Sequence, residues 1–182
     1  FVVDFHSGGK TLDFLPFCCA HILDDKEQQS RCIDAMKAFN APHSVMLLEI
    51  DAVNMYDTAA ENMGKVFIST ELGGGGSTSA YTVEIAKKGI RNLLRHTGIC
   101  QGDLEVSETL NLDMPDHRCY IFSETTGLVE HCVDLGDAVK EGQLVAKVHN
   151  IERTGEAPVE YFAGVDGIYT GRHYPGLVVN GD

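Results

Sequence analysis

One junction constrains the fold more than any other: a run of β-forming residues, 66–71, leads into Leu72 and four consecutive glycines. Val, Phe, Ile and Thr favour a strand, and glycines permit tight turns and close backbone approach. Apolar residues at helical spacing follow over residues 80–96. Open α/β sheets have this order of elements, and they bind ligands beyond the carboxyl ends of their strands. Glu71, the last residue of the run, therefore lies where such a sheet would place a functional carboxylate.

A second strand end matches the first. Residues 1–6 predict a buried strand that ends at His6 and is followed by Ser-Gly-Gly. A histidine and a glutamate at two strand ends suggest a metal ligand and a general base that share one site. The glycine run at 73–76 lacks the Lys-Ser/Thr pair of a phosphate-binding P-loop, which argues against a nucleotide ligand.

The first part of the chain, residues 1–103, alternates between strand and helix patterns. Strands are predicted at 1–6, 14–21, 44–50 and 66–71, and helices at 24–39, 56–63 and 80–96, with Asp24 as the first N-cap and Ser77 or Ser79 as the last. This alternation predicts an α/β domain with a mainly parallel sheet and flanking helices.

Residues 104–182 have a different character, with short β runs separated by glycine-containing turns. The runs are expected at 118–123, 127–133, 143–148, 159–163 and 167–171. The string G-D-A-V-K-E-G-Q at 136–143 resembles turns of the biotinyl and lipoyl carrier folds, without a carrier lysine in its usual hairpin setting. We therefore expect a small, all-β, barrel-sandwich-like domain and no swinging arm.

Composition narrows the function classes. The formal net charge is −13, which argues against nucleic acid as a partner because phosphate binding needs clustered Lys and Arg. No apolar run approaches the roughly 20 residues of a membrane span, so no membrane partner is predicted. Of the six cysteines, two are adjacent at 18–19 and four are scattered singly, and no C-x-x-C motif occurs. This pattern favours free, buried thiols and a cytoplasmic location.

A complete metal site is not evident. The H-x-x-E spacing at 149–152 falls in turn-rich β sequence, where the two side chains would not share a helix face, and no H-E-x-x-H motif occurs. The chain also begins within a predicted strand and has no initiator methionine. We therefore expect it to be a fragment of a longer protein, with part of any active site outside it.

Three segments together resemble the succinylglutamate desuccinylase/aspartoacylase family, zinc-dependent amidohydrolases related to the carboxypeptidases. They are D-F-H-S-G-G at 4–9, L-L-E-I-D-A-V-N-M-Y-D-T-A at 47–59 and S-T-E-L-G-G-G-G-S at 69–77. The resemblance covers essentially the whole chain. It implies a carboxypeptidase-like α/β fold, a Zn²⁺ cofactor and a small-molecule N-acyl amino acid as the substrate.

The resemblance also assigns roles to residues. His6 matches the later zinc-binding histidine of the family, and Glu71 matches its catalytic base. The other two zinc ligands belong to an early H-G-x-E motif that has no counterpart here and is expected upstream of residue 1. Asp4 either orients His6 from behind or is a carboxylate paired locally at the strand end.

Tyr56 matches a tyrosine that grips the substrate in the aspartoacylases, but the arginine that accompanies it there would fall near residues 60–61. An acidic residue, Glu61, Asp57 or Asp51, would suit an amine-bearing substrate by charge pairing. Alternatively, Glu61 is a solvated helix residue.

We expect zinc-dependent deacetylation of N-acetyl-2,4-diaminobutyrate. The alternatives are a desuccinylase or aspartoacylase with an acidic substrate, and a non-catalytic binding module. A homo-oligomer is possible on the sequence alone.

Overall fold

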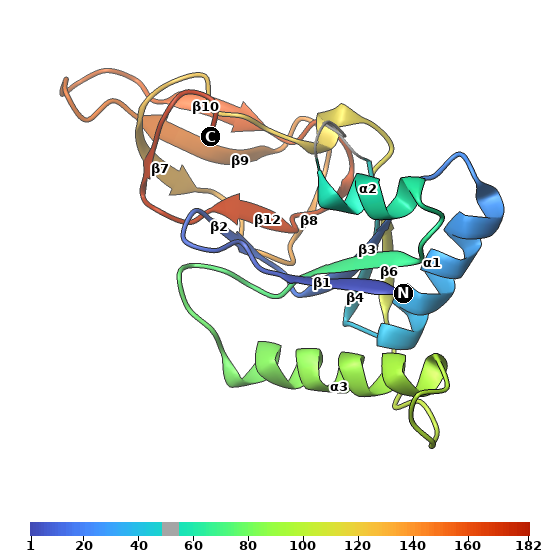
Figure 1. Ribbon diagram of the computed structural model, residues 1–182. Helices are drawn as coiled ribbons and strands as arrows, with labels where there is room; N and C mark the ends of the chain where they lie inside the picture. Colours follow the sequence, from blue (N-terminus) through green and yellow to red (C-terminus); the bar gives the residue numbers. More distant parts are fainter. Residues whose placement is uncertain (49–54) are drawn as a thin grey trace. The chain divides into compact units, whose positions relative to one another are not determined.

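The structure is a computed structural model that describes residues 1–48 and 55–182 (Figure 1). It divides into two compact units, each assembled from three stretches of the chain. Unit 1 comprises residues 1–7, 16–73 and 78–115, and unit 2 comprises residues 8–15, 74–77 and 116–182.

Unit 1 is built on a five-stranded sheet. Its strands, in spatial order, are β1 (Val2–His6), β5 (Phe67–Glu71), β3 (Phe17–His21), β4 (His43–Leu47) and β6 (Leu110–Asp113). Three of the four neighbouring pairs are parallel, and only β3 and β5 run antiparallel. The prediction of an α/β fold with a mainly parallel sheet is therefore confirmed.

Three helices accompany this sheet: α1 (Lys26–Phe39), α2 (Tyr56–Asn62) and α3 (Ala80–His96). Because side chains alternate along a strand, each strand contributes residues to both faces of the sheet. Ile68, Cys18 and Ala20 belong to the apolar core that includes buried residues of α1 and α3. Figure 1 shows α2 and α3 on opposite sides of the sheet, so α2 lies over the face that carries Phe67, Ser69 and Glu71.

The helix ends show how the sequence specifies α1 and α3. Ser79 caps α3 in a reciprocal capping box with Thr82. It is one of the two serines predicted as the N-cap of this helix. The predicted cap of α1, Asp24, is wrong by one residue: the Asp25 side chain accepts hydrogen bonds from the backbone N–H groups of Glu27 and Gln28. Only a residue at that position reaches the free N–H groups of the first turn.

Unit 2 contains short antiparallel strands. A four-stranded sheet has the order β10 (Val159–Phe162), β9 (Leu144–His149), β7 (Gly127–His131) and β13 (Leu177–Val178), and two smaller pairs join β8 (Ala138–Val139) to β11 (Gly167–Ile168) and β2 (Leu12–Phe14) to β12 (Gly171–His173). Val139, Val145 and Ala163 are buried together and form a small apolar core.

One predicted strand of this unit is absent. Residues 118–123 contain no strand in the described structure; a 3₁₀ turn, η1 (His117–Cys119), occupies the start of the segment. The Asp116 side chain accepts from the backbone N–H of Arg118 and also binds its guanidinium group. These local bonds favour a turn over an extended strand, although the residue types alone suggested β structure.

The units also differ from the domains proposed from the sequence, 1–103 and 104–182. Strand β6 pairs with β4, so residues up to 115 belong to unit 1. Strand β2 pairs with β12, more than a hundred residues away, so residues 8–15 belong to unit 2. Long-range pairings of this kind leave no local trace in the sequence.

Candidate active site

The register between β1 and β5 brings the two main candidate residues together. Residues of the two parallel strands face each other in the order His6 with Glu71 and Asp4 with Ser69. These four positions alternate with core-facing residues, so their side chains lie on the same face of the sheet. The structure thus places Glu71, His6 and Asp4 at one end of one pair of strands.

Asp4 engages one specific nitrogen of His6. Its carboxylate Oδ2 pairs with the Nδ1 atom of the His6 ring. The His6 side chain is 57% exposed, whereas that of Asp4 is 19% exposed. A carboxylate on Nδ1 favours the tautomer with the proton on that nitrogen, which leaves the lone pair of Nε2 for another ligand.

Glu71 has the properties of a general base. Within the described residues, its Oε2 atom is buried and has no hydrogen-bond partner. Burial raises the pKa of Glu71 to about 7, with His6 lowering it and the Asp4 carboxylate adding to the increase. A carboxylate that titrates near neutral pH can both accept a proton and return it.

The donor set fits part of a zinc site. His6 offers an imidazole nitrogen, and Glu71 offers a carboxylate that could take a proton from a bound water. A catalytic zinc has three protein ligands, and no group of three His, Cys, Asp or Glu side chains suited to a metal occurs among residues 1–48 and 55–182. Of the groups that a catalytic zinc site needs, the described residues therefore offer one metal ligand and the general base.

Tyr56 joins this group from α2. Its ring packs edge-on against Phe67 with the ring centroids 5.7 Å apart. Partial burial and the nearby Asp4 carboxylate raise the pKa of Tyr56. Tyr56 is thus placed on the same face of the sheet as Asp4 and His6.

The acidic candidates of α2 have other partners. Asp57 accepts a hydrogen bond of 2.6 Å from the backbone N–H of Thr58. Glu61 is not solvated: it is buried, and its Oε1 lies 3.0 Å from Nδ1 of His21. Asp51 lies outside the described residues.

Sequence reasoning missed two buried contacts below the site. The first is the His21–Glu61 pair, which no spacing rule connects because 40 residues separate its members. The second joins β3 to β5: the Sγ atom of Cys19 lies 3.0 Å from Oγ of Ser69, and burial raises the pKa of Cys19 to about 12. The Cys19 thiol therefore stays protonated. The prediction of buried free thiols holds for Cys18, Cys19 and Cys32 and is wrong for Cys100 and Cys132, which are exposed, and for Cys119, which is partly exposed.

The glycine loop after Glu71 serves backbone packing inside unit 2. The N–H of Gly75 donates to the carbonyl of Leu12 at 3.0 Å. A Cβ atom on Gly74 would lie 2.0 Å from the same carbonyl oxygen, and one on Gly75 would lie 2.8 Å from the Tyr174 ring. Side chains at these two positions would collide with unit 2, which explains the glycines.

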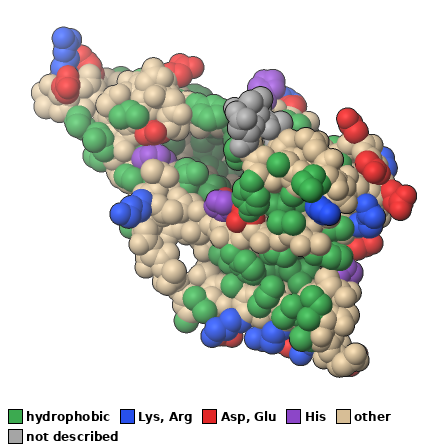
Figure 2. Space-filling view, viewed as in Figure 1, with side chains coloured by type: hydrophobic (Ala, Val, Ile, Leu, Met, Phe, Trp, Pro, Cys, Tyr) green, Lys and Arg blue, Asp and Glu red, His purple; other side chains and the backbone are tan. Residues whose placement is uncertain are grey.

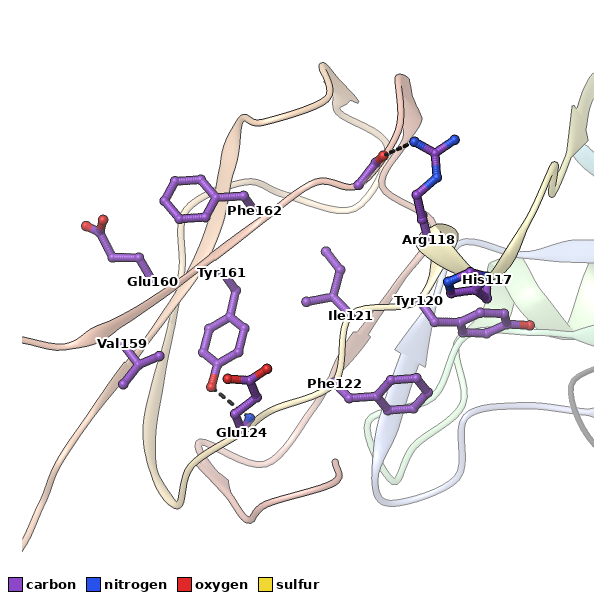
Figure 3. A pocket seen from close by; sticks show the side chains of 11 residues that line it. His117, Arg118, Tyr120, Ile121, Phe122, Glu124, Val159, Glu160, Tyr161 and Phe162 are labelled. Carbon is purple, nitrogen blue, oxygen red and sulfur yellow. Dashed lines mark hydrogen bonds between the residues drawn. The ribbon is translucent and has the colours of Figure 1, made fainter.

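A separate hollow of about 460 Å³ lies in unit 2 (Figure 3). Its walls combine aromatic and aliphatic side chains with charged ones, and they are formed by His117, Arg118, Tyr120, Ile121, Phe122, Glu124, Val159, Glu160, Tyr161, Phe162 and Gly164. The Tyr161 hydroxyl accepts from the backbone N–H of Glu124 at 2.9 Å. None of the residues singled out from the sequence as catalytic or metal-binding lines this hollow.

Figure 2 shows basic side chains dispersed among acidic ones on the face displayed, without a broad positive patch. Among the described residues, no helix is both long and apolar enough to cross a membrane.

The chain is thus an α/β protein with a mainly parallel sheet that places a histidine and a glutamate at adjoining strand ends. The model of the succinylglutamate desuccinylase/aspartoacylase catalytic domain matches residues 1–97. The chain belongs to this family.

Individual relatives agree with the assignment. N-alpha-acetyl-L-2,4-diaminobutyric acid deacetylase from Halomonas elongata is 49% identical over 100% of this chain and 54% of its own length. The product-bound ectoine utilization protein EutE (DoeB) from Ruegeria pomeroyi is 59% identical, with a TM-score of 0.96 over 99% of this chain and 55% of that one. A succinylglutamate desuccinylase/aspartoacylase from Rhodobacter sphaeroides is 32% identical, with a TM-score of 0.90 over 99% and 55% of the two chains. The chain thus spans about half the length of these relatives.

Proposed function

We propose that this chain is part of a zinc-dependent amidohydrolase that removes the acetyl group from N-acetyl-L-2,4-diaminobutyrate. Membership of the family supports the hydrolase class. The Halomonas elongata relative is named for this deacetylation, and its identity extends along the whole of this chain. A cytoplasmic location and a homo-oligomer also remain predictions for the whole protein.

The observation that carries the proposal is the state of Glu71. Its buried Oε2 atom, which has no partner among the described residues, and its pKa of about 7 suit a group that accepts a proton from water and donates it to the departing amine. His6, opposite Glu71 in the register, would hold the metal through Nε2. When bound, zinc would supply an acidified water and polarise the acyl carbonyl.

Tyr56 and Asp57, at the start of α2, are the proposed substrate-binding residues. Glu61 does not serve this role in the proposal, because its carboxylate is buried against His21. An acidic group facing the substrate amine would favour diaminobutyrate over aspartate or glutamate derivatives.

The test uses the full-length protein and its Glu71→Gln variant. Zinc content is measured by mass spectrometry, and acetate release is measured with N-acetyl-L-2,4-diaminobutyrate. We expect about one zinc per chain in both proteins and a loss of kcat of about 10²–10⁴-fold in the variant. Glu84→Gln, which changes a 64% exposed side chain on α3, is the matched control and should keep full activity.

Other outcomes would contradict the proposal in different ways. Faster hydrolysis of N-acetylaspartate or N-succinylglutamate would favour the desuccinylase or aspartoacylase alternative. A wild-type protein without metal and without acyl release would favour a binding module.

A further inference from the structure

We propose that Thr70 is a positioning residue: its buried hydroxyl binds the backbone of His6 and so fixes the histidine relative to Glu71, the residue that follows Thr70. The inference rests on the proposed function, in which His6 binds zinc and Glu71 is the general base. It assigns a role in the site to a side chain on the face of β5 opposite to Glu71.

The first support is the pair of contacts that the Thr70 hydroxyl makes. The backbone N–H of His6 donates to Oγ1 of Thr70 at 3.2 Å, and the hydroxyl in turn donates to the backbone carbonyl of His6 at 3.4 Å. A hydroxyl has one hydrogen to donate and two lone pairs to accept with, so it can engage both groups at once. One side chain therefore restrains the peptide groups on both sides of the His6 Cα atom.

The second support is the surroundings of this hydroxyl. Thr70 is completely buried, and its neighbours on the same face, Ile68 and Leu72, pack in the apolar core of unit 1. Burial of a hydroxyl costs free energy unless it forms hydrogen bonds, and valine would offer the same β-branched shape without that cost. The hydroxyl is therefore better explained by its bonds to His6 than by packing.

The third support is the location of His6 at the end of a strand. His6 is the last residue of β1, and within the described part of the chain β1 pairs with β5 alone. The backbone N–H of Leu72 donates to the His6 carbonyl at 3.0 Å. Ends of elements fray more readily than their centres, so the additional bonds from Thr70 restrain His6 where the strand pairing stops.

A restraint on the backbone complements the contact that His6 makes through its ring. The His6 side chain is 57% exposed, so packing restrains it only in part. Asp4 pairs with Nδ1 and sets the orientation of the ring, whereas Thr70 sets the position of the backbone from which the ring extends. Functional groups need to be held within about 0.5 Å of their productive geometry, and these two contacts act on different parts of that requirement.

The experiment compares three substitutions of Thr70 in the full-length protein. Thr70→Val removes the hydroxyl and keeps the branched shape, Thr70→Ser keeps the hydroxyl and loses the methyl group, and Thr70→Ala loses both. Zinc affinity is measured by competition with a chelator, alongside kcat and KM. Hydrogen exchange of the β1 amides, followed by mass spectrometry on the metal-free protein, reports on the backbone of His6 without any metal. Denaturant unfolding gives the stability of each variant.

Thr97→Val is the matched control. The Thr97 hydroxyl also donates to a backbone carbonyl, at 2.8 Å, but it lies at the carboxyl end of α3. The residue before it, His96, packs against Phe1, at the opposite end of β1 from His6. This variant therefore loses a comparable bond away from the site.

We expect zinc affinity to follow the hydroxyl. Thr70→Val and Thr70→Ala should bind zinc about tenfold more weakly, with a lower kcat, little change in KM and faster exchange of the β1 amides. Thr70→Ser and Thr97→Val should bind zinc like the wild type.

Stability should follow a different order, because Thr70→Ser and Thr70→Ala both lose a buried methyl group. A role of Thr70 in stability alone would instead make zinc affinity fall in step with the free energy of unfolding. The comparison of Thr70→Ser with Thr70→Ala, which differ only in the hydroxyl, gives the same test if Thr70→Val does not fold.

Wild-type zinc affinity in Thr70→Val and Thr70→Ala would overturn the inference and leave the proposed function intact. An equal loss in Thr70→Ser and Thr70→Ala would also overturn it, because the methyl group and not the hydroxyl would then be responsible. A wild-type protein that binds no zinc would overturn the proposed function, and the inference with it.

Discussion

Burial changes what the Glu71 carboxylate can do. On a solvated surface it would be ionised and bound to water at neutral pH, whereas at the end of β5 one oxygen is buried without a partner within the described residues. The same burial makes ionisation costly and raises its pKa to about 7. The same property that costs stability would provide the proton transfer in the proposed function, and shifted pKa values of this kind are common at functional sites.

This cost predicts how stability depends on pH. The pKa of Glu71 is raised from 4.5 to about 7 in the folded state. Between these values the folded protein keeps a proton that the unfolded chain has released, so stability falls as pH rises through this window. Glu71→Gln should remove the fall and stabilise the metal-free protein above pH 7 by about 1–3 kcal/mol.

Denaturant unfolding of the metal-free full-length protein at pH 5 and pH 8 measures this difference. Glu84→Gln, at an exposed ion pair with Lys87, should show no gain at pH 8. Equal gains from the two variants would mean that burial of Glu71 is not the cause.

The positions and surroundings of the candidate site residues could be predicted from the sequence to different extents. The strand-end positions of His6 and Glu71 follow from local patterns, and a parallel pair of strands brings such ends together. The environment of Glu61 could not be predicted. Its burial depends on His21, and a short helix next to a sheet gives no local sign of which polar residue faces inward.

Among the elements, α1 and α3 make the closest described approach of two helices. Gly89 lies at the contact: a Cβ atom there would come within 2.3 Å of the Phe39 ring. Phe39 is fully buried, so its ring has little room to move. The glycine lets the two helices meet at the cost of a weaker helix former in α3.

Gly89→Ala should therefore destabilise the protein. Alanine favours a helix by about 1 kcal/mol over glycine, but overpacking of a buried contact costs about 1–3 kcal/mol. We expect a net loss of up to about 2 kcal/mol, measured by denaturant unfolding. Gly167→Ala adds a methyl group in open space and is the control. A stabilised Gly89→Ala variant would show that the Phe39 ring can move to make room for the added methyl group.

Helices and the longer strands were easier to predict than short β segments. α1 and α3 have regular apolar spacing and strong caps, which identify them from the sequence alone. β6 and β13 have no such pattern and exist because of their partners β4 and β7. Pairing partners far along the chain decide such strands, and local propensity does not.

At the scale of the molecule, the chain passes repeatedly between its two units. Residues 8–15 and 74–77 interrupt unit 1 and belong to unit 2. Strand β2 supplies the described partner of β12, and the Gly171 backbone approaches the Phe14 ring so closely that a Cβ atom would lie 2.4 Å from it. Unit 2 therefore depends on sequence from the first half of the chain.

Residues 116–182 alone should consequently fold poorly. Without β2, strand β12 loses its pairing and exposes an edge. We expect poorly dispersed amide signals by NMR and no cooperative thermal transition. The same fragment with residues 8–15 joined by a flexible linker should regain cooperativity. A cooperative transition in the fragment alone, near that of the intact protein, would contradict this expectation.

The same arrangement limits how such a protein can be recombined. Exchanging everything after residue 115 with a related sequence would leave a native β2 and a native glycine loop to fit a foreign β12 and a foreign residue in place of Tyr174. The segment that contains β2, residues 8–15, begins two residues after His6. The segment that contains the glycine loop, residues 74–77, begins three residues after Glu71. A poorly matched graft would thus disturb the backbone next to both His6 and Glu71. Evolution by exchange of whole domains is therefore unfavourable for such a protein, and we expect sequence changes in the two units to accumulate together.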